Sequence, residues 1–488
     1  MGKTIVFVNP PLSAEKRYGA LAQAGYTEPP FGLCYLAAVT RQRGLNTSIV
    51  DAQALDLGIK ETVDAILSFA PDYVGITATT VLIISAATIA REIKQRNPAI
   101  IVIIGGVHVT ALPEETMRDN PHFDLAVIGE GEETLIELLN ALEEGKEPRS
   151  VNGLVVRQPP DEVFLTGERP VIKNLDQLPY PAFDLLPDMG KYYRTATQSV
   201  SRLPALSLIT SRGCPGKCTF CDTSVHGHVP RAHSAEYVAD LMTMLNKQYG
   251  ARSIFFHDDN FLIFKPRLKK LVEILKSRQL DVAWTCMGRV DMVDLETLEI
   301  AKSGGCWQVL YGIETGSQKI LDFYKKKTTL EQIERAIGLT KRAGLRTKGF
   351  LMFGNPLETT ESIKTTIDFI KRIGLDDVSI TFLTPFPGSE IYEEAENYGK
   401  LDRDWERMSC FDIVFVPDGF TEEELRYWVK TAYRQFYFRP QIIFSYLRRI
   451  TSPTQLKELF LSGLALLKYT LSRRQRSSLH RDSGKGRK

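Results

Sequence analysis

Short apolar runs alternate with stretches of helical periodicity over the first 145 residues. The runs are apolar at nearly every position, which is typical of parallel strands that are covered on both faces. The pattern therefore predicts an α/β domain, residues 1–145, built on a doubly wound parallel sheet. The expected strands are 4–8, 47–50, 73–77, 100–104 and 125–128, and the expected helices are 33–43, 59–69, 84–94 and 132–142.

A second alternation begins at Ala205 and contains six strand–helix units. These units predict a partial (β/α)6 barrel, residues 201–390, that is open on one side and has its active site at the carboxyl ends of the strands. The expected strands are 205–210, 253–257, 282–285, 308–312, 347–352 and 378–381, and the expected helices are 235–248, 266–278, 295–303, 330–343 and 361–373.

The remaining segments differ in composition from these two domains. Residues 146–200 are rich in Pro, Asp and Arg and are interpreted as a linker, with short strand-like pieces at 153–156 and 170–173. Residues 391–472 are expected to form a helical C-terminal region. The basic, polar tail 473–488 is expected to be disordered.

Composition limits the cellular setting and the partners. The formal net charge of +2 argues against binding to nucleic acid through bulk electrostatics. No secretory signal and no apolar run of the length of a membrane span is visible, so a cytoplasmic location is expected. After residue 438, apolar residues mix with Lys and Arg. This part could make a peripheral contact with a membrane, cover an apolar substrate, or cap the barrel.

Cysteines indicate the chemistry. Three of the seven, Cys214, Cys218 and Cys221, lie within eight positions on a Gly/Pro-rich loop after the first barrel strand. Three thiolates can hold one corner of a [4Fe-4S] cluster and leave one iron open. A zinc site completed by His226 or His228 is the alternative, although the spacing does not match the usual zinc motifs. The other cysteines are expected to be buried thiols: Cys34, Cys286, Cys306 and Cys410.

The C-x3-C-x2-C loop, with an aromatic residue before its last cysteine, resembles the signature of radical S-adenosylmethionine (SAM) enzymes. The resemblance implies that the open iron binds SAM. It also implies that an electron, from a donor such as flavodoxin or ferredoxin, cleaves SAM to a 5′-deoxyadenosyl radical. Segments 257–261, 312–317 and 349–354 resemble further motifs of the family. The SAM-binding residues implied in this way are Phe220, Asp258, Asp259, Asn260, Glu314, Gly349 and Gly354.

The motifs at the strand ends of the first domain resemble, in their order, the cobalamin-binding Rossmann-like domain of one large class of radical SAM enzymes. Residues 9–14, after the first strand, contain no histidine, so a cobalamin without a His lower ligand is implied. A fold that binds another nucleotide is the alternative, but no G-x-G-x-x-G follows the first strand. The acidic segment 129–134 is interpreted as the start of a helix. The cobalamin-binding residues implied are Asn9, Pro10, Thr77, Thr79, Gly105, Gly106 and His108.

Together the two motif sets favour a cobalamin-dependent radical SAM enzyme. The resemblance implies transfer of a methyl group to an unactivated carbon of a small or apolar substrate, such as a tetrapyrrole or a lipid. Residues 436–440 resemble a segment of the anaerobic magnesium-protoporphyrin monomethyl ester cyclase group, so oxidative cyclisation or rearrangement is the alternative. A non-catalytic corrinoid-binding protein is an alternative of another class. The sequence identifies no residue that acts on the substrate radical.

Overall fold

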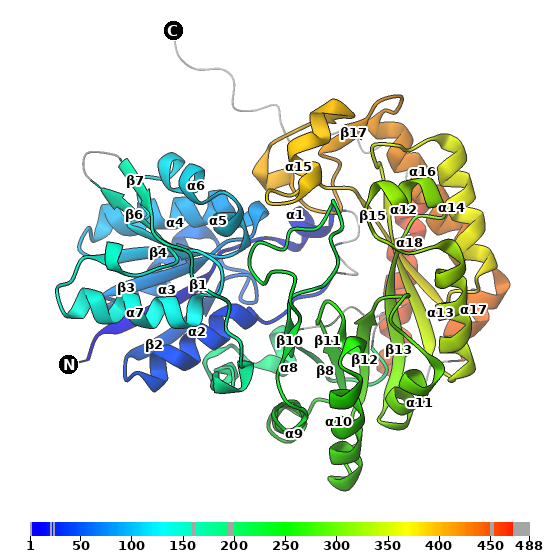
Figure 1. Cartoon of the computed structure of the whole chain (residues 1–488), viewed down its shortest axis with the longest axis horizontal. Helices are drawn as coiled ribbons and strands as arrows, with labels where there is room; N and C mark the ends of the chain where they lie inside the picture. Colours follow the sequence, from blue (N-terminus) through cyan, green and yellow to red (C-terminus); the bar gives the residue numbers. More distant parts are fainter. Residues whose placement is uncertain are drawn as a thin grey trace.

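The computed structural model describes residues 2–19, 22, 25–158, 162–193, 195, 200–448 and 453–471. Two α/β units lie side by side in Figure 1, the first in blue and cyan and the second in green and yellow. The C-terminal segment, in orange and red, follows the second unit. The basic tail 473–488, predicted to be disordered, lies outside the described residues.

The first unit is built on one mixed sheet. Its strands are β1 (Thr4–Asn9), β2 (Asn46–Asp51), β3 (Tyr73–Thr77), β4 (Ile101–Gly105), β5 (Leu125–Val127), β6 (Leu154–Gln158) and β7 (Glu162–Leu165). Their order in the sheet is β2-β1-β3-β4-β5-β6-β7. Strands β1 to β5 pair in parallel, which confirms the doubly wound sheet predicted from the apolar runs.

Helices cover both faces of this sheet. They are α1 (Ala14–Tyr18), α2 (Phe31–Gln42), α3 (Ile59–Ser68), α4 (Ile83–Arg96), α5 (Val107–Ala111), α6 (Pro113–Asp119) and α7 (Gly131–Glu143). Helices α2 and α7 pack on the face that carries Ile5 and Phe7, whereas α3 and α4 pack on the face of Val6 and Val8. Successive side chains of a strand point to opposite faces, so β1 contributes to both cores.

The first part of the segment interpreted as a linker, 146–200, belongs to the first sheet. Strand β6 pairs antiparallel with β5, and β7 pairs antiparallel with β6, so this segment extends the first sheet. The strand expected at 153–156 is present as β6, whereas residues 170–173, all described, form no strand. Beyond β7 the chain crosses to the second unit through the short helix α8 (Met189–Tyr192).

The second unit is the predicted partial barrel. Its strands are β8 (Ala205–Leu208), β11 (Ser253–Phe256), β12 (Ala283–Gly288), β13 (Cys306–Glu314), β14 (Arg346–Phe353) and β15 (Asp377–Phe382). All neighbours pair in parallel, in the order β15-β14-β13-β12-β11-β8, so β15 and β8 are the two edges. The outer helices are α9 (Ala235–Tyr249), α10 (Lys265–Ser277), α11 (Leu295–Ser303), α12 (Gln318–Phe323), α13 (Leu330–Arg342) and α14 (Thr360–Arg372).

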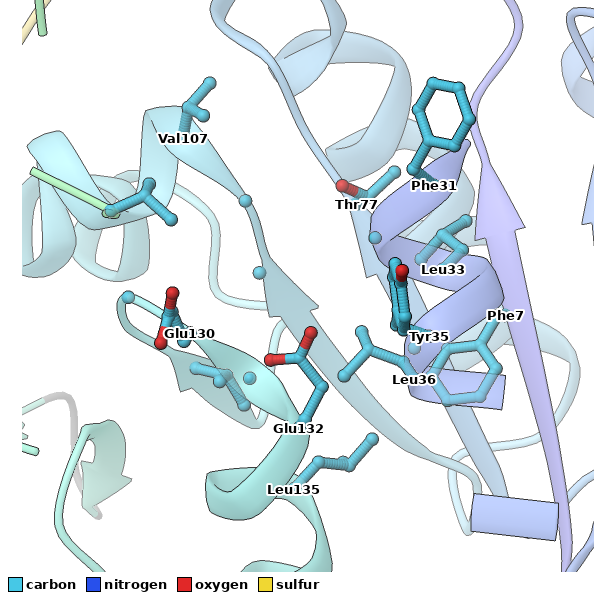
Figure 2. A pocket seen from close by; sticks show the side chains of 18 of the residues that line it. Phe7, Phe31, Leu33, Tyr35, Leu36, Thr77, Val107, Glu130, Glu132 and Leu135 are labelled. Atoms are coloured by element: carbon cyan, nitrogen blue, oxygen red, sulfur yellow. The ribbon is translucent and has the colours of Figure 1, made fainter. Parts of the chain in front are cut away.

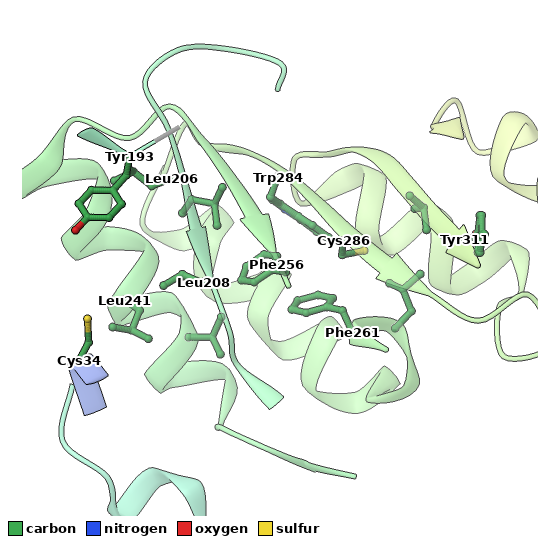
Figure 3. Packing of buried hydrophobic residues seen from close by; sticks show 14 of the residues in the cluster. Cys34, Tyr193, Leu206, Leu208, Leu241, Phe256, Phe261, Trp284, Cys286 and Tyr311 are labelled. Atoms are coloured by element: carbon green, nitrogen blue, oxygen red, sulfur yellow. The ribbon is translucent and has the colours of Figure 1, made fainter. Parts of the chain in front are cut away.

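One continuous apolar core joins the two units. In the barrel it fills the space between strands and helices, where the rings of Phe256 and Trp284 meet edge to face with centroids 5.8 Å apart. Cys34 of α2 and Tyr193 after α8 belong to the same core as Leu206 and Leu208 of the first barrel strand (Figure 3). Because interiors are close-packed, a shared core holds the two sheets at a fixed separation.

The C-terminal region is helical, as predicted, with one addition. Its helices are α15 (Glu390–Glu394), α16 (Glu422–Tyr437), α17 (Pro440–Leu447) and α18 (Pro453–Leu471). An antiparallel pair of short strands, β16 (Gly399–Leu401) and β17 (Phe415–Pro417), was not predicted. Among the helices of the described residues, none has the length and apolar content that a membrane span needs.

Two tyrosines of α16 satisfy the free backbone groups of the edge strand β15. The Ile380 N–H donates to the Tyr433 hydroxyl (2.9 Å), which in turn donates to the Ile380 carbonyl (3.0 Å). The Tyr437 hydroxyl donates to the Val378 carbonyl (2.8 Å). Unpaired edge groups attract further strands, so this contact ends the sheet at β15.

We expect Tyr433→Phe to lower the free energy of unfolding by about 1–3 kcal/mol, because it leaves a buried N–H and a buried C=O of Ile380 without partners. Urea unfolding followed by circular dichroism measures the change. Tyr427→Phe on the same helix is the matched control, since Tyr427 is 56% exposed. Equal effects of the two substitutions would contradict the capping role.

Candidate active site

The three-cysteine loop is closed at its base by a short antiparallel sheet. Strands β9 (Ser211–Arg212) and β10 (Arg231–Ala232) pair with each other, so residues 213–230 form one excursion after β8. Gly213 opens the loop with φ +85°, and a Cβ there would lie 2.7 Å from the Val229 carbonyl oxygen. Glycine is therefore required at the start of the loop.

The thiols of the loop share one small volume. A Cβ on Gly216 would lie 3.4 Å from Cys214 Sγ and 3.7 Å from Cys218 Sγ, so two thiols flank one point of the backbone. Burial raises the pKa of Cys221 to about 12, and Asp259 and the other two thiols add to the effect. Thiolates gathered in this way need a cationic partner, which bound iron supplies. The donor set therefore fits a [4Fe-4S] cluster.

The histidines of the zinc alternative have other partners. His228 Nδ1 donates to the Gly216 carbonyl (3.0 Å), and its Nε2 lies 3.3 Å from Thr223 Oγ1. His226 Nδ1 lies 3.2 Å from Glu130 Oε1 of the first unit. Within the described ranges, no group of three His, Cys, Asp or Glu side chains is placed to hold a single metal ion. His226 and His228 each already use a ring nitrogen in another contact, which counts against a zinc site that either would complete.

Two cations of the barrel border the loop. Arg289, which follows β12, forms two hydrogen bonds to Asp291 (3.0 and 3.1 Å) and one to the Lys326 carbonyl (3.0 Å). Its guanidinium lies 3.0 Å from the point that a Cβ on Gly216 would occupy. Burial raises the pKa of Cys218, while Lys326 and Arg289 oppose this effect. Positive charge here stabilises thiolates and any added electron on a cluster.

Asp258, an expected SAM ligand, forms its hydrogen bonds with neighbouring groups of the protein. Its fully buried carboxylate accepts hydrogen bonds from the Thr210 N–H (2.6 Å), the Thr210 hydroxyl (2.7 Å) and the Ser211 hydroxyl (2.6 Å). Arg267 lies 3.5 Å from the same carboxylate. Asp258 therefore ties the end of β11 to the segment that leads into the cysteine loop.

Its two neighbours remain available to a ligand. Asp259 is exposed. Desolvation of its carboxylate by the surrounding protein raises its pKa, His226 opposes this effect, and Asp258 adds to it. Asn260 is buried; its Nδ2 lies 3.0 Å from Met292 Sδ, and its Oδ1 has no hydrogen-bond partner in the described part of the chain. An unpaired buried acceptor costs about 1–3 kcal/mol, which a ligand that donates a hydrogen bond would recover.

Glu314 stands at a strained point at the end of β13. Its backbone has φ +64°, a left-handed conformation that costs a residue with a side chain about 1–3 kcal/mol. The carboxylate bonds to the Lys326 ammonium, which lies 5.8 Å from the centre of the Phe220 ring. The ion pair holds the strained residue beside the aromatic residue of the cysteine loop.

At the two positions where glycine is expected to bind SAM, the structure requires glycine for different reasons. A Cβ on Gly349 would lie 2.8 Å from Ile313 and 2.9 Å from Leu375, so packing of the barrel accounts for this glycine. Gly354, at the end of β14, has φ +84° and donates its N–H to Glu358 Oε2 (3.2 Å). Gly354 therefore lies at the end of a strand in a turn that only glycine adopts easily.

A cavity of about 260 Å³ lies between the first sheet and the cysteine loop. Figure 2 shows Phe31, Leu33, Tyr35 and Leu36 of α2 on one side of it, and the carboxylates of α7 and its preceding residue on the other. The loop supplies part of the wall through its residues 225 and 226. The wall also includes residues with small or polar side chains: Gly32, Gly75, Thr77, Thr79, Gly105 and Gly106.

A buried ion cluster links the two units at this cavity. Arg212 donates to Glu132 (2.5 Å) and lies 3.2 Å from Glu130, and Arg231 donates to Glu130 (2.9 Å). These four side chains are only 3% to 9% exposed. Burial would raise the pKa of Glu130, but His226, Arg231 and Arg212 hold it well below its ordinary value. Segment 129–134 does start a helix, as predicted, and it also carries this contact.

Three residues expected to bind cobalamin do not line the cavity. Asn9 donates to the carboxylate at the end of β2 (2.8 Å), and Pro10 follows it. His108 is buried in α5, 3.3 Å from Thr80 Oγ1, with its ring centroid 5.2 Å from that of Trp405. Burial lowers the pKa of His108 to about 4, so the imidazole is neutral at physiological pH.

Both halves of the chain match known families. A B12 binding domain matches residues 18–139, and the Radical SAM superfamily matches residues 208–370. An uncharacterized methyltransferase of Pyrococcus horikoshii is 37% identical over 443 residues, which are 90% of this chain and 94% of that protein. The anaerobic magnesium-protoporphyrin IX monomethyl ester cyclase of Rubrivivax gelatinosus is 29% identical over 415 residues, covering 84% of this chain and 74% of the cyclase.

Solved structures share the fold. OxsB, a cobalamin-dependent SAM radical enzyme with aqua-cobalamin and SAM bound, gives a TM-score of 0.74 at 19% identity and covers 96% of this chain and 72% of its own. TsrM from Kitasatospora setae, with cobalamin and a [4Fe-4S] cluster bound, gives 0.65 at 18% identity, covering 81% and 75%. The chain therefore belongs to the cobalamin-dependent radical SAM enzymes, a family with methyltransferases and tetrapyrrole cyclases among its members. The resemblance drawn from the two motif sets is confirmed.

We expect Glu130→Gln to destabilise the protein by about 3–5 kcal/mol, because it leaves Arg231 without its charge partner in a buried site. Urea unfolding measures the loss. Because the pKa of Glu130 is lowered on folding, its contribution is complete above about pH 4.5 and is lost as the pH falls through the folded pKa. Wild type should therefore lose more stability than the variant on acidification.

Glu133→Gln is the matched control for this prediction. Glu133 lies in the first turn of the same helix, is 52% exposed and approaches Arg169 only to 3.8 Å. Exposed pairs of this kind contribute about 0–1 kcal/mol. If the two variants unfold at the same urea concentration, the buried cluster does not join the units.

Proposed function

We propose that this protein is a cobalamin-dependent radical SAM methyltransferase that acts on an unactivated carbon of a small, apolar biosynthetic intermediate. One observation carries the proposal: the cysteine loop itself forms part of the wall of the cavity in the B12-binding unit. Relatives described as methyltransferases include the Pyrococcus horikoshii protein and, at 27% identity, the cytidylyl-2-hydroxyethylphosphonate methyltransferase of Streptomyces wedmorensis.

In this proposal Cys214, Cys218 and Cys221 ligate a [4Fe-4S] cluster with one open iron. When bound, the cluster and SAM supply a 5′-deoxyadenosyl radical, and cobalamin supplies the methyl group. The unpaired amide Oδ1 of Asn260 is suited to accept a hydrogen bond from the SAM amine, with the carboxylate of Asp259 beside it as a second acceptor. The further SAM contacts proposed are Phe220, Glu314 and Gly354.

The cavity is proposed to receive the nucleotide tail of cobalamin. Gly105 and Gly106 expose backbone, and Thr77 and Thr79 offer hydroxyls at the carboxyl ends of the parallel strands, the edge at which such sheets bind ligands. His108 is directed to Thr80 and Trp405, and residues 9–14 contain no histidine. We therefore propose that no histidine of this chain ligates the lower face of the cobalt.

The chain's own residues then perform three tasks. Asp258 fixes the entry to the cysteine loop, and Arg289 and Lys326 place positive charge beside it. The shared core and the buried ion cluster hold the two units together, with the cysteine loop beside the cavity. A one-electron donor such as flavodoxin or ferredoxin and a cytoplasmic setting complete the proposal.

Oxidative cyclisation is the second candidate. The cyclase of Rubrivivax gelatinosus covers 84% of this chain, and residues 436–440 resemble a segment of that group. Product analysis separates the two reactions. A methylated product, with two SAM consumed per turnover, indicates methyl transfer, whereas a new ring without methylation indicates cyclisation.

We expect Cys218→Ala to abolish cluster assembly and SAM cleavage, because a cluster with two thiolate ligands is not retained. Iron and sulfide analysis after anaerobic reconstitution, with 5′-deoxyadenosine quantified under reductant, measures both effects. Cys410→Ala is the matched control, since Cys410 lies outside the loop. Full SAM cleavage by Cys218→Ala, or no cleavage by wild type, would overturn the proposal, and the latter would leave a corrinoid-binding role.

We expect Gly32→Phe to reduce cobalamin retention at least tenfold, because the new side chain enters the cavity. Gly32 lines it, has no left-handed φ, and a Cβ there would meet no atom within 4 Å. Absorbance of bound cobalamin after gel filtration provides the measurement. Gly338→Phe is the control, since Gly338 on α13 is equally open and lies far from the cavity. Unchanged cobalamin content in Gly32→Phe would refute this assignment.

A further inference from the structure

Positive charge is concentrated at the C-terminal end of this chain. Twelve of the 61 Lys and Arg residues, but only two of the 59 Asp and Glu residues, follow residue 438. This segment therefore has a formal charge of +10, and the preceding 438 residues have −8. The net charge of +2 conceals this separation. A surface that attracts the segment must be anionic, and it would repel much of the rest of the protein.

Helix α17 carries a row of exposed apolar side chains. Phe444 is 55% exposed and Leu447 is 58% exposed, with Ile443 beside them. The opposite side of the helix is anchored through Ile442, which is buried against α16. Arg448 ends the helix, with its guanidinium 4.2 Å from the centre of the Phe444 ring. Apolar side chains and a cation thus share the outer face.

Helix α18 repeats this arrangement. Leu456 is 50% exposed and Phe460 is 67% exposed. Leu467, 11 residues after Leu456, returns to the same side of the helix because 11 residues make about three turns. Lys457 and Lys468 are also 11 residues apart and form a parallel row next to the apolar one. On the other side Ala465 is buried, and the Tyr469 ring lies with its centroid 6.1 Å from that of Tyr433 on α16.

We propose that the outer faces of α17 and α18 bind the surface of an anionic lipid membrane. Apolar rows bordered by Lys and Arg are the chemistry by which helices lie in a membrane interface. Each basic residue near an anionic leaflet adds to the attraction, and the basic residues after α18 contribute in the same way. A nucleic acid would use the charges but leave the phenylalanines and leucines in water.

The helices lie on the barrel side of the molecule, with α17 at the edge opposite the first unit (Figure 1). Docking through them would leave the space between the two units free of the membrane. It would also place the barrel next to a lipid phase, where an apolar substrate is concentrated. The binding itself requires no radical chemistry, so it can fail or succeed independently of the proposed reaction.

The test is flotation of the full-length, reconstituted protein with two kinds of vesicles. One kind contains phosphatidylcholine alone, and the other contains phosphatidylcholine with phosphatidylglycerol. We expect binding to the anionic vesicles, at least tenfold weaker binding for the double variant Phe444→Ser/Phe460→Ser, and weaker binding at high salt. Lys457→Gln/Lys468→Gln should lower affinity for the anionic vesicles alone. Phe69→Ser is the control, since Phe69 is 43% exposed on the first unit.

Thermal unfolding and cluster absorbance verify that each variant is folded, and the charge variant preserves the test if the double serine variant is not. Unchanged vesicle binding by both double variants would overturn the proposal. So would an oligomer in solution that the serine substitutions dissociate, because a second copy of the chain would then cover these faces. Binding to RNA without binding to vesicles would overturn it as well.

Discussion

Two buried glutamates of the B12-binding unit are neutralised by two arginines of the barrel, and the geometry between the units depends on this contact. A buried carboxylate without a partner is too costly to keep charged, so Glu130 and Glu132 require Arg231 and Arg212 at hydrogen-bond distance. Both arginines belong to the strands that close the cysteine loop. The contact that joins the two units therefore also fixes the base of the cysteine loop beside the cavity.

Within the barrel, the loop is held by contacts that leave its interior accessible. The Asp258 carboxylate accepts hydrogen bonds from Thr210 and Ser211, which fixes where the loop begins. On the other side, the Lys326 ammonium pairs with Glu314, whose backbone is strained. Strain of this kind persists only where surrounding contacts enforce it, and it concentrates at functional sites.

The fold was predictable because its signal is local. Each apolar run that was expected to be a parallel strand is one, since strands covered on both faces leave a continuous apolar pattern. Strand β7 and the pairing of β6 with the first sheet were missed, because both strands lie at the edge of the sheet in a segment rich in Pro and charged residues. The β16–β17 pair was missed because three-residue strands carry no periodicity.

The site was predictable only in part. The three cysteines are adjacent in sequence and were identified, whereas Arg212 meets Glu132 across 80 residues, which no local pattern encodes. Arg289 was not predicted for the same reason, namely that its bond to Lys326 joins residues distant in sequence. The contact between Glu28 and His257 (3.1 Å), which also joins the two units, was not predicted either. Residues 258–260 were recognised as a family motif. The sequence could not show that Asp258 bonds to the protein or that Asn260 keeps an unpaired oxygen. That difference is set by the direction of side chains at the end of one strand.

The hydroxyls of Tyr433 and Tyr437, which bond to the backbone of β15, show how this barrel can remain open. An open sheet normally ends in an edge strand whose unpaired N–H and C=O groups attract other strands. Closed barrels avoid such an edge, because their last strand pairs with the first. Here helix α16 takes the place of a further strand, because the hydroxyls of Tyr433 and Tyr437 bond to backbone groups of β15. Freed from the need to close, the fold can devote its gap to cofactors and substrates wider than a sealed barrel would admit.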